Sequence, residues 1–202
     1  MKFKIRLLTY CFCVASKSIL FAQTVNTNFG SNGFVTTDFA NDADAFGTMA
    51  TLPDGKIILF GSSKIAGIVQ FGNSNTSGTN QSMVLAMVKY NTDGSLDSSF
   101  GLNGKVYYHV DTYQNFTPFC SIAQSDGKVI VGGRSYGLLS ERAFLLRFLP
   151  DGSLDAGFGV NGFTTLESEN IYDLFLDANN KIVVVGEKNQ DGCIERINTN
   201  GF

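Results

Sequence analysis

The sequence predicts an all-β protein, built as a partial, open β-propeller of about three four-stranded antiparallel blades. A string of the form Asp-Gly-Ser-Leu-Asp-x-x-Phe-Gly-x-Asn-Gly occurs at residues 93–104 and 151–162, with a weaker copy at 23–33. A recurring unit of this size is a building block that gains stability by stacking on its neighbours. The composition of 22 Gly, 18 Phe and no Trp suits many short strands and tight turns.

Each unit divides into four strand-sized segments. Aromatic and β-branched residues follow an Asn-Gly turn in the first segment, and Asp-Gly or Asn-Asn precedes the third, supplying the positive φ angles of a hairpin turn. The third segments are apolar at successive positions, which indicates strands covered on both faces. In order of position, the expected strands are 34–37, 105–110 and 163–166; 46–51, 118–123 and 171–176; 54–61, 126–133 and 179–186; and 83–90, 143–148 and 193–197.

The units span about residues 23–93, 94–151 and 152–202. The first unit is longer because of a polar stretch at 72–81, which we expect to be a surface loop between the third and fourth strands. Residues 200–202 match the turn at which a fourth unit would open. Closed propellers have about four to eight blades. We therefore expect a fragment of a longer propeller, or one part of an assembly that self-associates through uncovered end blades.

The first 22 residues have the features of a signal peptide. Lys2, Lys4 and Arg6 precede the apolar run 7–15, and a small residue, Ala22, stands at the expected cleavage site. Cleavage there would start the mature chain at the opening of a repeat. The apolar run is too short and too interrupted to be retained as a membrane-spanning helix. The prediction is a protein that is secreted or displayed on the outer cell surface, without a membrane span in the mature chain.

The mature chain keeps two of the four cysteines, Cys120 and Cys193, since Cys11 and Cys13 leave with the signal peptide. An oxidising compartment would allow the two to pair. They stand at different positions of the repeat, however, which favours two small buried thiols.

The recurring string, followed by Asp-Gly-Lys-(Ile/Val)-Ile and by a basic and an aromatic residue before the next turn, resembles the delta-60 repeat family over residues 23–202. The resemblance implies a bacterial secreted or surface β-propeller, often part of a large multidomain chain, with no catalytic residues to carry over. The chain departs from the pattern at residues 23–28, at Asn179 and Asn180 in place of Asp-Gly, and in the long loop of the first unit.

We assign no catalytic, cofactor-binding or metal-binding residue from the sequence. His109 is the only histidine and has no Cys or second His near it in the chain. We expect a half-exposed strand residue there, because a metal site or a catalytic triad would have to recruit distant partners.

Carboxylates near the turns raise the question of calcium, which prefers oxygen ligands. They are Asp42 with Asp44, Asp93 with Asp97, and Asp151 with Asp155. The complete spacing of a calcium loop is missing. We expect instead that Asp93 and Asp151 accept hydrogen bonds from their own turns. The recurring Gly30, Gly101 and Gly159 are expected to shape turns, and Phe29, Phe100 and Phe158 to fill the blade cores.

Two classes of function remain. With a net charge of −3 and no basic run after the first residues, the chain is not expected to bind nucleic acid. The favoured hypothesis is a non-catalytic, secreted or surface-displayed module that serves as a scaffold for contact with a protein or a glycan. The alternative is an extracellular propeller-type lyase or hydrolase with its site at the central channel, for which one histidine and few arginines are a poor supply. A degraded reading frame without a function of its own is a third possibility.

Overall fold

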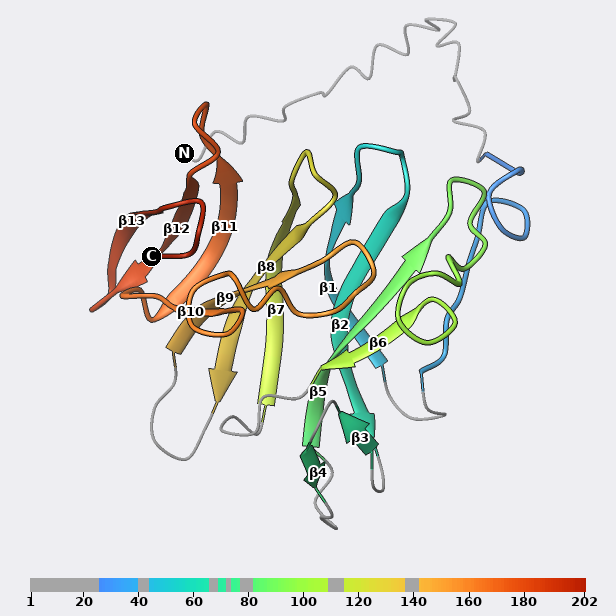
Figure 1. Cartoon of the computed structure of the whole chain (residues 1–202), viewed down its shortest axis with the longest axis horizontal. Helices are drawn as coiled ribbons and strands as arrows, with labels where there is room; N and C mark the ends of the chain where they lie inside the picture. Colours follow the sequence, from blue (N-terminus) through green and yellow to red (C-terminus); the bar gives the residue numbers. More distant parts are fainter. Residues whose placement is uncertain are drawn as a thin grey trace, which may run out of the picture.

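The computed structural model describes residues 26–39, 44–65, 69–71, 74–76, 82–108, 115–136 and 142–202. Within these ranges the protein consists of strands and turns, without helices, and three antiparallel sheets of three or four strands follow one another as blades (Figure 1). No helix that could span a membrane is therefore present in the described ranges. The predicted fold class, an all-β open propeller, is confirmed.

The blades are made of strands that are close in the sequence. Blade 1 has the order β1 (Asp44–Thr51), β2 (Ile57–Ile65), β5 (Ser82–Tyr90) and β6 (Lys105–Tyr108). Blade 2 has the order β7 (Asn115–Ala123), β8 (Val129–Tyr136), β9 (Arg142–Phe148) and β10 (Phe163–Thr165). Blade 3 contains β11 (Asn170–Leu176), β12 (Ile182–Lys188) and β13 (Asp191–Ile197). A separate hairpin, β3 (Val69–Phe71) and β4 (Ser74–Thr76), lies within the insertion of the first unit.

The blades are offset from the sequence units by one strand. Each complete blade takes three strands from one unit and its outer strand from the next, so that Lys105 of β6 lies opposite Val88 of β5. The cause is the Asn-Gly turn: Asn103 and Gly104 have φ angles of 53° and 87°, and the flanking Leu102 and Lys105 exchange backbone hydrogen bonds. This tight turn folds the new strand back beside the strand just before it in the chain.

The expected first strand at 34–37 is not a strand in this structure. Phe34 makes only isolated bridges to Gly30 and Ser31, and residues 35–38 have no regular structure. In the two later units the strand at this position, β6 or β10, pairs with the fourth strand of the unit before it. The predicted signal peptide at 1–22, His109, Asp42 and much of the loop at 72–81 lie outside the described residues.

Apolar side chains join the blades to one another. One buried cluster, which includes Phe60, Met87 and Phe144, lies between blades 1 and 2, and a second, which includes Ile130, Leu145 and Val184, lies between blades 2 and 3. The third-position strands are buried at successive residues over 129–133 in β8 and 182–184 in β12, as predicted, whereas Ile57 and Leu59 of β2 are only half-buried. The first strands of neighbouring blades also touch: β1 contacts β7, and β7 contacts β11. The β1 strand comes so close that a Cβ atom on Gly47 would stand 2.3 Å from the carbonyl oxygen of Pro118.

Candidate functional site

A compact cap near the start of each unit has the same backbone at residues 26–33, 97–104 and 155–162. The amide of the cap phenylalanine donates to the residue three positions earlier, at 3.1 Å from Phe29 to Asn26 and at 3.0 Å from Phe100 to Asp97. Each cap also stacks on the following turn, through a bond from Gly30 to Asp93 of 2.7 Å and its equivalents at Gly101 and Gly159. The N-terminal cap is therefore fully formed.

Each of the two later caps places a carboxylate between two cations. Asp97, which is 5% exposed, lies 2.9 Å from the Nζ atom of Lys56 and 3.3 Å from that of Lys89. A hydrogen bond from the Ser99 hydroxyl, together with the two lysines, outweighs the effect of burial and holds the pKa of Asp97 well below its usual range. These contacts tie the cap to the strands of its blade.

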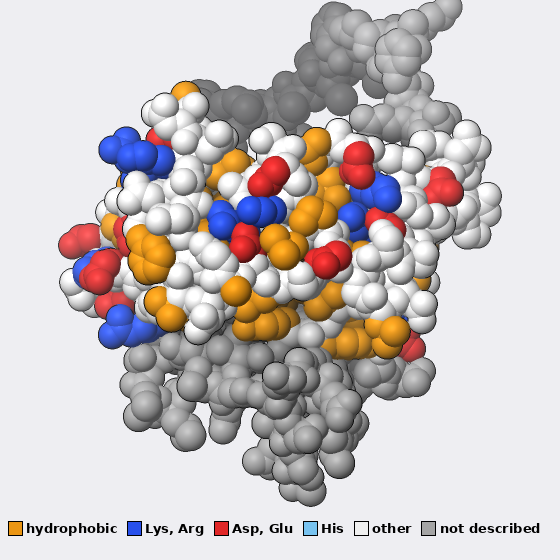
Figure 2. Space-filling view, in the orientation of Figure 1, with side chains coloured by type: hydrophobic (Ala, Val, Ile, Leu, Met, Phe, Trp, Pro, Cys, Tyr) orange, Lys and Arg blue, Asp and Glu red, His pale blue; other side chains and the backbone are white. Residues whose placement is uncertain are grey.

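Asp155 repeats the arrangement with different cations. Its carboxylate lies 2.8 Å from Nε of Arg147 and 3.3 Å from Nζ of Lys128. Burial opposes ionisation, but the Gly157 amide and the two cations outweigh it and lower the pKa of Asp155. Acidic and basic side chains are accordingly interleaved on the face of the molecule that Figure 2 shows.

The sequence did not reveal these ion pairs. From the sequence, Asp97 and Asp155 are candidate calcium ligands near turns, whereas in the structure both hold cationic side chains of the protein. A usable signal was present, because a basic residue is next to last in each fourth strand and a lysine directly precedes each third strand, at Lys56, Lys128 and Lys181. The described residues contain no group of three or more His, Cys, Asp or Glu side chains that could hold a metal ion.

Asp93 and Asp151 behave as predicted. Asp93 accepts bonds of 2.9 Å from the amide and 2.7 Å from the hydroxyl of Ser95, and Asp151 does the same with Ser153. The serine hydroxyl is the main reason that the pKa of each carboxyl is lowered. Both aspartates therefore stabilise their own turns.

The other sequence-predicted positions have mixed outcomes. Phe100 and Phe158 are buried as expected, beneath Lys89 and Arg147 respectively, but Phe29 is only half-buried. Gly30, Gly101 and Gly159 have positive φ angles in their caps, as expected.

The two cysteines of the described chain are free thiols and form no disulfide. Cys120 is buried, and this burial raises the pKa of its thiol to about 12. Cys193 is only half-buried on β13, so the expectation of two buried thiols holds for one of them.

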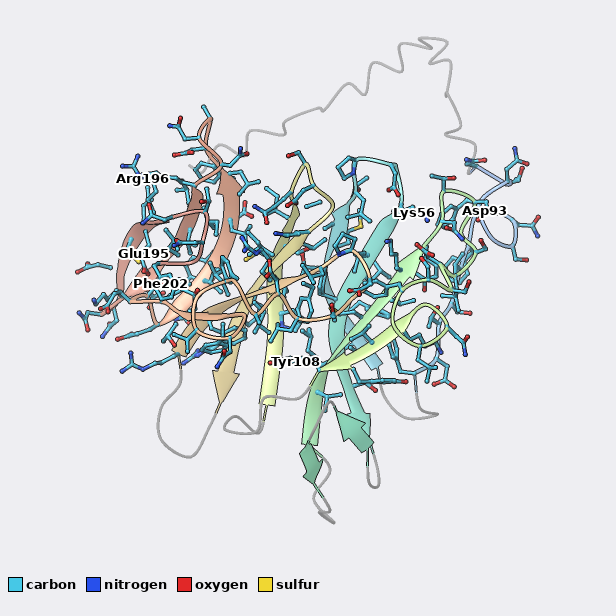
Figure 3. All side chains as sticks on the ribbon, in the orientation of Figure 1. Lys56, Asp93, Tyr108, Glu195, Arg196 and Phe202 are labelled. Carbon is cyan, nitrogen blue, oxygen red and sulfur yellow. The ribbon has the colours of Figure 1, made fainter. Side chains whose placement is uncertain are left out.

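Blade 3 differs from the other two at the same positions. Its basic residues, Lys181 and Arg196, match Lys56 and Lys89 of blade 1, yet neither makes an ion pair within the part of the chain that is described. Arg196 and Glu195 project from opposite faces of β13 at the blade 3 end of the molecule, and Glu195 lines a hollow together with Phe202 (Figure 3). The blade presents cations without the carboxylate that completes blades 1 and 2.

The outer face of blade 3 has apolar residues at its centre and charged residues beside them. Ile194 is 73% exposed and Phe175 is 47% exposed, on the same face as the half-buried Val185 and as Val183, which is only 8% exposed. Asp173 and Arg196 share this face. The corresponding residues of blade 2, such as Ile130 and Leu145, are fully buried against blade 3. We call this surface, made by Phe175, Val183, Val185 and Ile194, the open blade face.

A hollow of 390 Å³ adjoins β13 on its other face, between that strand and β10. Its lining includes Phe163, Leu166, Glu195, Ile197 and Phe202. A smaller hollow of 240 Å³ lies between the turns of blades 1 and 2, beside Lys89 and Pro150.

The fold and the repeated caps define a β-propeller repeat protein. A family model described as "Domain of unknown function (DUF5122) beta-propeller" matches residues 71–100 and 124–158, which contain β5, β8, β9 and parts of two caps. No curated protein matches the chain. The similarity supports the propeller class, and the narrower assignment to delta-60 repeats stays a prediction.

Proposed function

We propose that the protein is a secreted or surface-displayed, non-catalytic β-propeller module that acts as an interaction scaffold. The observation that carries this proposal is the open blade face, where Phe175 and Ile194 are exposed at positions that in blade 2 pack against a neighbour. Isolated exposed apolar residues are ordinary, but a contiguous apolar face marks a contact surface.

The ionisable residues support the same conclusion. Asp97 and Asp155, with their lysine and arginine partners, are engaged in holding caps to blades. Their recurrence at equivalent positions fits a role in the repeat architecture. The function then depends on the surface that the blades present.

The test combines binding and turnover on one sample. The protein is immobilised and exposed to a panel of bacterial surface polysaccharides and to solubilised envelope proteins, while released sugar is measured in the eluate. We expect retention without product release, and loss of retention in Ile194→Glu. A matched control is Leu102→Glu, because Leu102 is 77% exposed but lies in a cap turn. Release of sugar would refute the non-catalytic role.

The location is tested separately. Expression of the whole chain in a bacterium, followed by mass spectrometry of the N-terminus, should find a mature protein starting at Gln23 outside the cytoplasm. A protein that keeps Met1 and stays in the cytoplasm would refute export.

A further inference from the structure

We infer that the free edge of β13 binds residues 26–37 of a second copy of this chain, which adds the fourth strand to blade 3. This inference rests on the proposed function and names its partner. The contact is head-to-tail: the N-terminal cap and the segment after it, from one copy, complete the last blade of the other.

The first argument is that the strands equivalent to β13 in blades 1 and 2 have their edges covered by a cap and the strand after it. The edge of β5 is covered by the cap at 97–104 and by β6, and the edge of β9 by the cap at 155–162 and by β10. The segment at 26–37 has the same cap backbone, and its following residues pair with no sheet strand among the described residues. The chain thus carries both a free edge and a segment of the type that covers such edges.

The second argument is the position of the N-terminal cap on its own copy. Gly30 donates to Asp93 as Gly101 donates to Asp151, so the cap already sits against the blade that follows it. Among the described residues, no blade lies on the other side of this cap. A second copy that supplied blade 3 there would leave every existing contact of the cap in place.

The third argument is the fit of side chains. By the register of β6 and β10, Phe34 of a second copy would lie opposite Glu195 and on the same face as Ile197. The hollow of 390 Å³ lies on that face, and Phe34 is 69% exposed. The equivalent residue of blade 2, Phe163, stacks on Phe144 at 5.4 Å. The hollow therefore has room for an aromatic ring that the chain exposes.

The fourth argument concerns the polar side chains of the cap. Asn26 occupies the cap position of Asp97, and its Oδ1 atom accepts the Asn28 amide at 3.1 Å just as Oδ1 of Asp97 accepts that of Ser99. Oδ2 of Asp97 binds Lys56 and Lys89, so in a second copy the Nδ2 atom of Asn26 would stand at the matching place beside Lys181 and Arg196, where a carboxylate would complete the blade as Asp97 completes blade 1. Arg196 would also cover the half-buried Phe29, as Arg147 covers Phe158 at 4.5 Å.

A covalent cross-link tests the register. Thr36 of a second copy would lie opposite Cys193, as Tyr107 lies opposite Ala86 and Thr165 opposite Phe144. Directly opposed strand residues bring their Cβ atoms within reach of a disulfide. In Thr36→Cys, mild oxidation with diamide should form a disulfide between two chains. Adding Cys193→Ser to Thr36→Cys should abolish the cross-link. Ser31→Cys alone, which places an exposed cysteine in the cap instead of at position 36, should form none.

Sedimentation tests the association without a cross-link. We expect the unmodified protein to sediment as a species of at least two chains, and Ile194→Lys as a monomer that remains folded. Asn26→Asp should tighten association about fivefold, because a carboxylate oxygen replaces the side-chain amide nitrogen opposite two cations. Asn28→Asp adds the same charge two residues away and should have a much smaller effect.

The outcomes separate the two proposals. A protein that stays monomeric and does not cross-link, or that associates without the Thr36→Cys link, would overturn the head-to-tail contact. If that monomer still loses retention of an envelope component on Ile194→Glu, the interaction role stands and only the identity of its partner is overturned. Release of sugar would instead refute the interaction role itself.

Discussion

Replacing Asp97 with Asn should destabilise the protein by about 3 kcal/mol at neutral pH. The substitution keeps the shape of the side chain and the bond from the Ser99 amide, but it removes the negative charge 2.9 Å from Lys56 and 3.3 Å from Lys89. The side chain of Lys89 is only 8% exposed. Its charge would stay buried with the Pro150 carbonyl as its main remaining acceptor.

The magnitude follows from these two contacts. A hydrogen bond to a charged group contributes about 1 kcal/mol more than a neutral one, which gives about 2 kcal/mol for the two lysines. The uncompensated charge of Lys89 adds about 1 kcal/mol, and the total lies at the low end of the cost of breaking a buried ion pair, about 3 to 5 kcal/mol. Lys56, at 30% exposure, is partly hydrated and limits the loss.

The assay is urea unfolding followed by far-UV circular dichroism, with a lower midpoint and an unchanged slope expected for Asp97→Asn. Asp93→Asn is the matched control, because Asp93 is exposed and its side chain accepts hydrogen bonds only from Ser95 of its own turn. The pKa of Asp97 is lowered from its ordinary value of 3.8, so its contribution is present above about pH 4 and is lost as the pH falls below that value. Equal losses for the two variants, or a difference between Asp97→Asn and the natural protein that does not shrink in acid, would refute the reasoning.

Two further predictions concern packing and thiol reactivity. Gly47→Ala should lower the free energy of unfolding by about 1 to 3 kcal/mol, because its new methyl group would stand 2.3 Å from the Pro118 carbonyl oxygen. Gly192→Ala is the control, since the space around Gly192 is open, and its urea midpoint should equal that of the natural protein. Similar midpoints for the two variants would contradict this. In the folded protein at pH 8, Cys193 should react with a thiol reagent and Cys120 should not, since burial raises the pKa of Cys120 to about 12. Mass spectrometry of the labelled peptides measures both reactions, and labelling of Cys120 before Cys193 would contradict the prediction.

Much of the fold could be predicted because its signals are local. An Asn-Gly pair sets a two-residue turn, an Asp-Gly-Ser string folds back on its own aspartate, and an apolar run between turns forms a buried strand. The bonds from Ser95 to Asp93 and the positive φ angle at Asn103 are contacts within a few residues, so composition and spacing predict them.

The assignment of strands to blades could not be predicted in the same way. The boundaries of the sequence units and of the blades differ by one strand. The boundary of a sequence repeat can be drawn at any position of the repeating pattern, whereas the boundary of a sheet is set by which strands pair. The segment at 34–37 has the sequence of a strand, yet it has no regular structure, because pairing and not propensity makes a strand.

The sequence by itself determined the repeat, the all-β class, the strand-forming segments and the turn chemistry, since each is decided by residues close together in the chain. Only the tertiary structure decided that Asp97 holds Lys56 and Lys89, that Lys181 and Arg196 of blade 3 make no ion pair within the described residues, and that a hollow lies beside β13. These features join residues from different strands and different units. Their geometry exists only after the blades have paired and stacked.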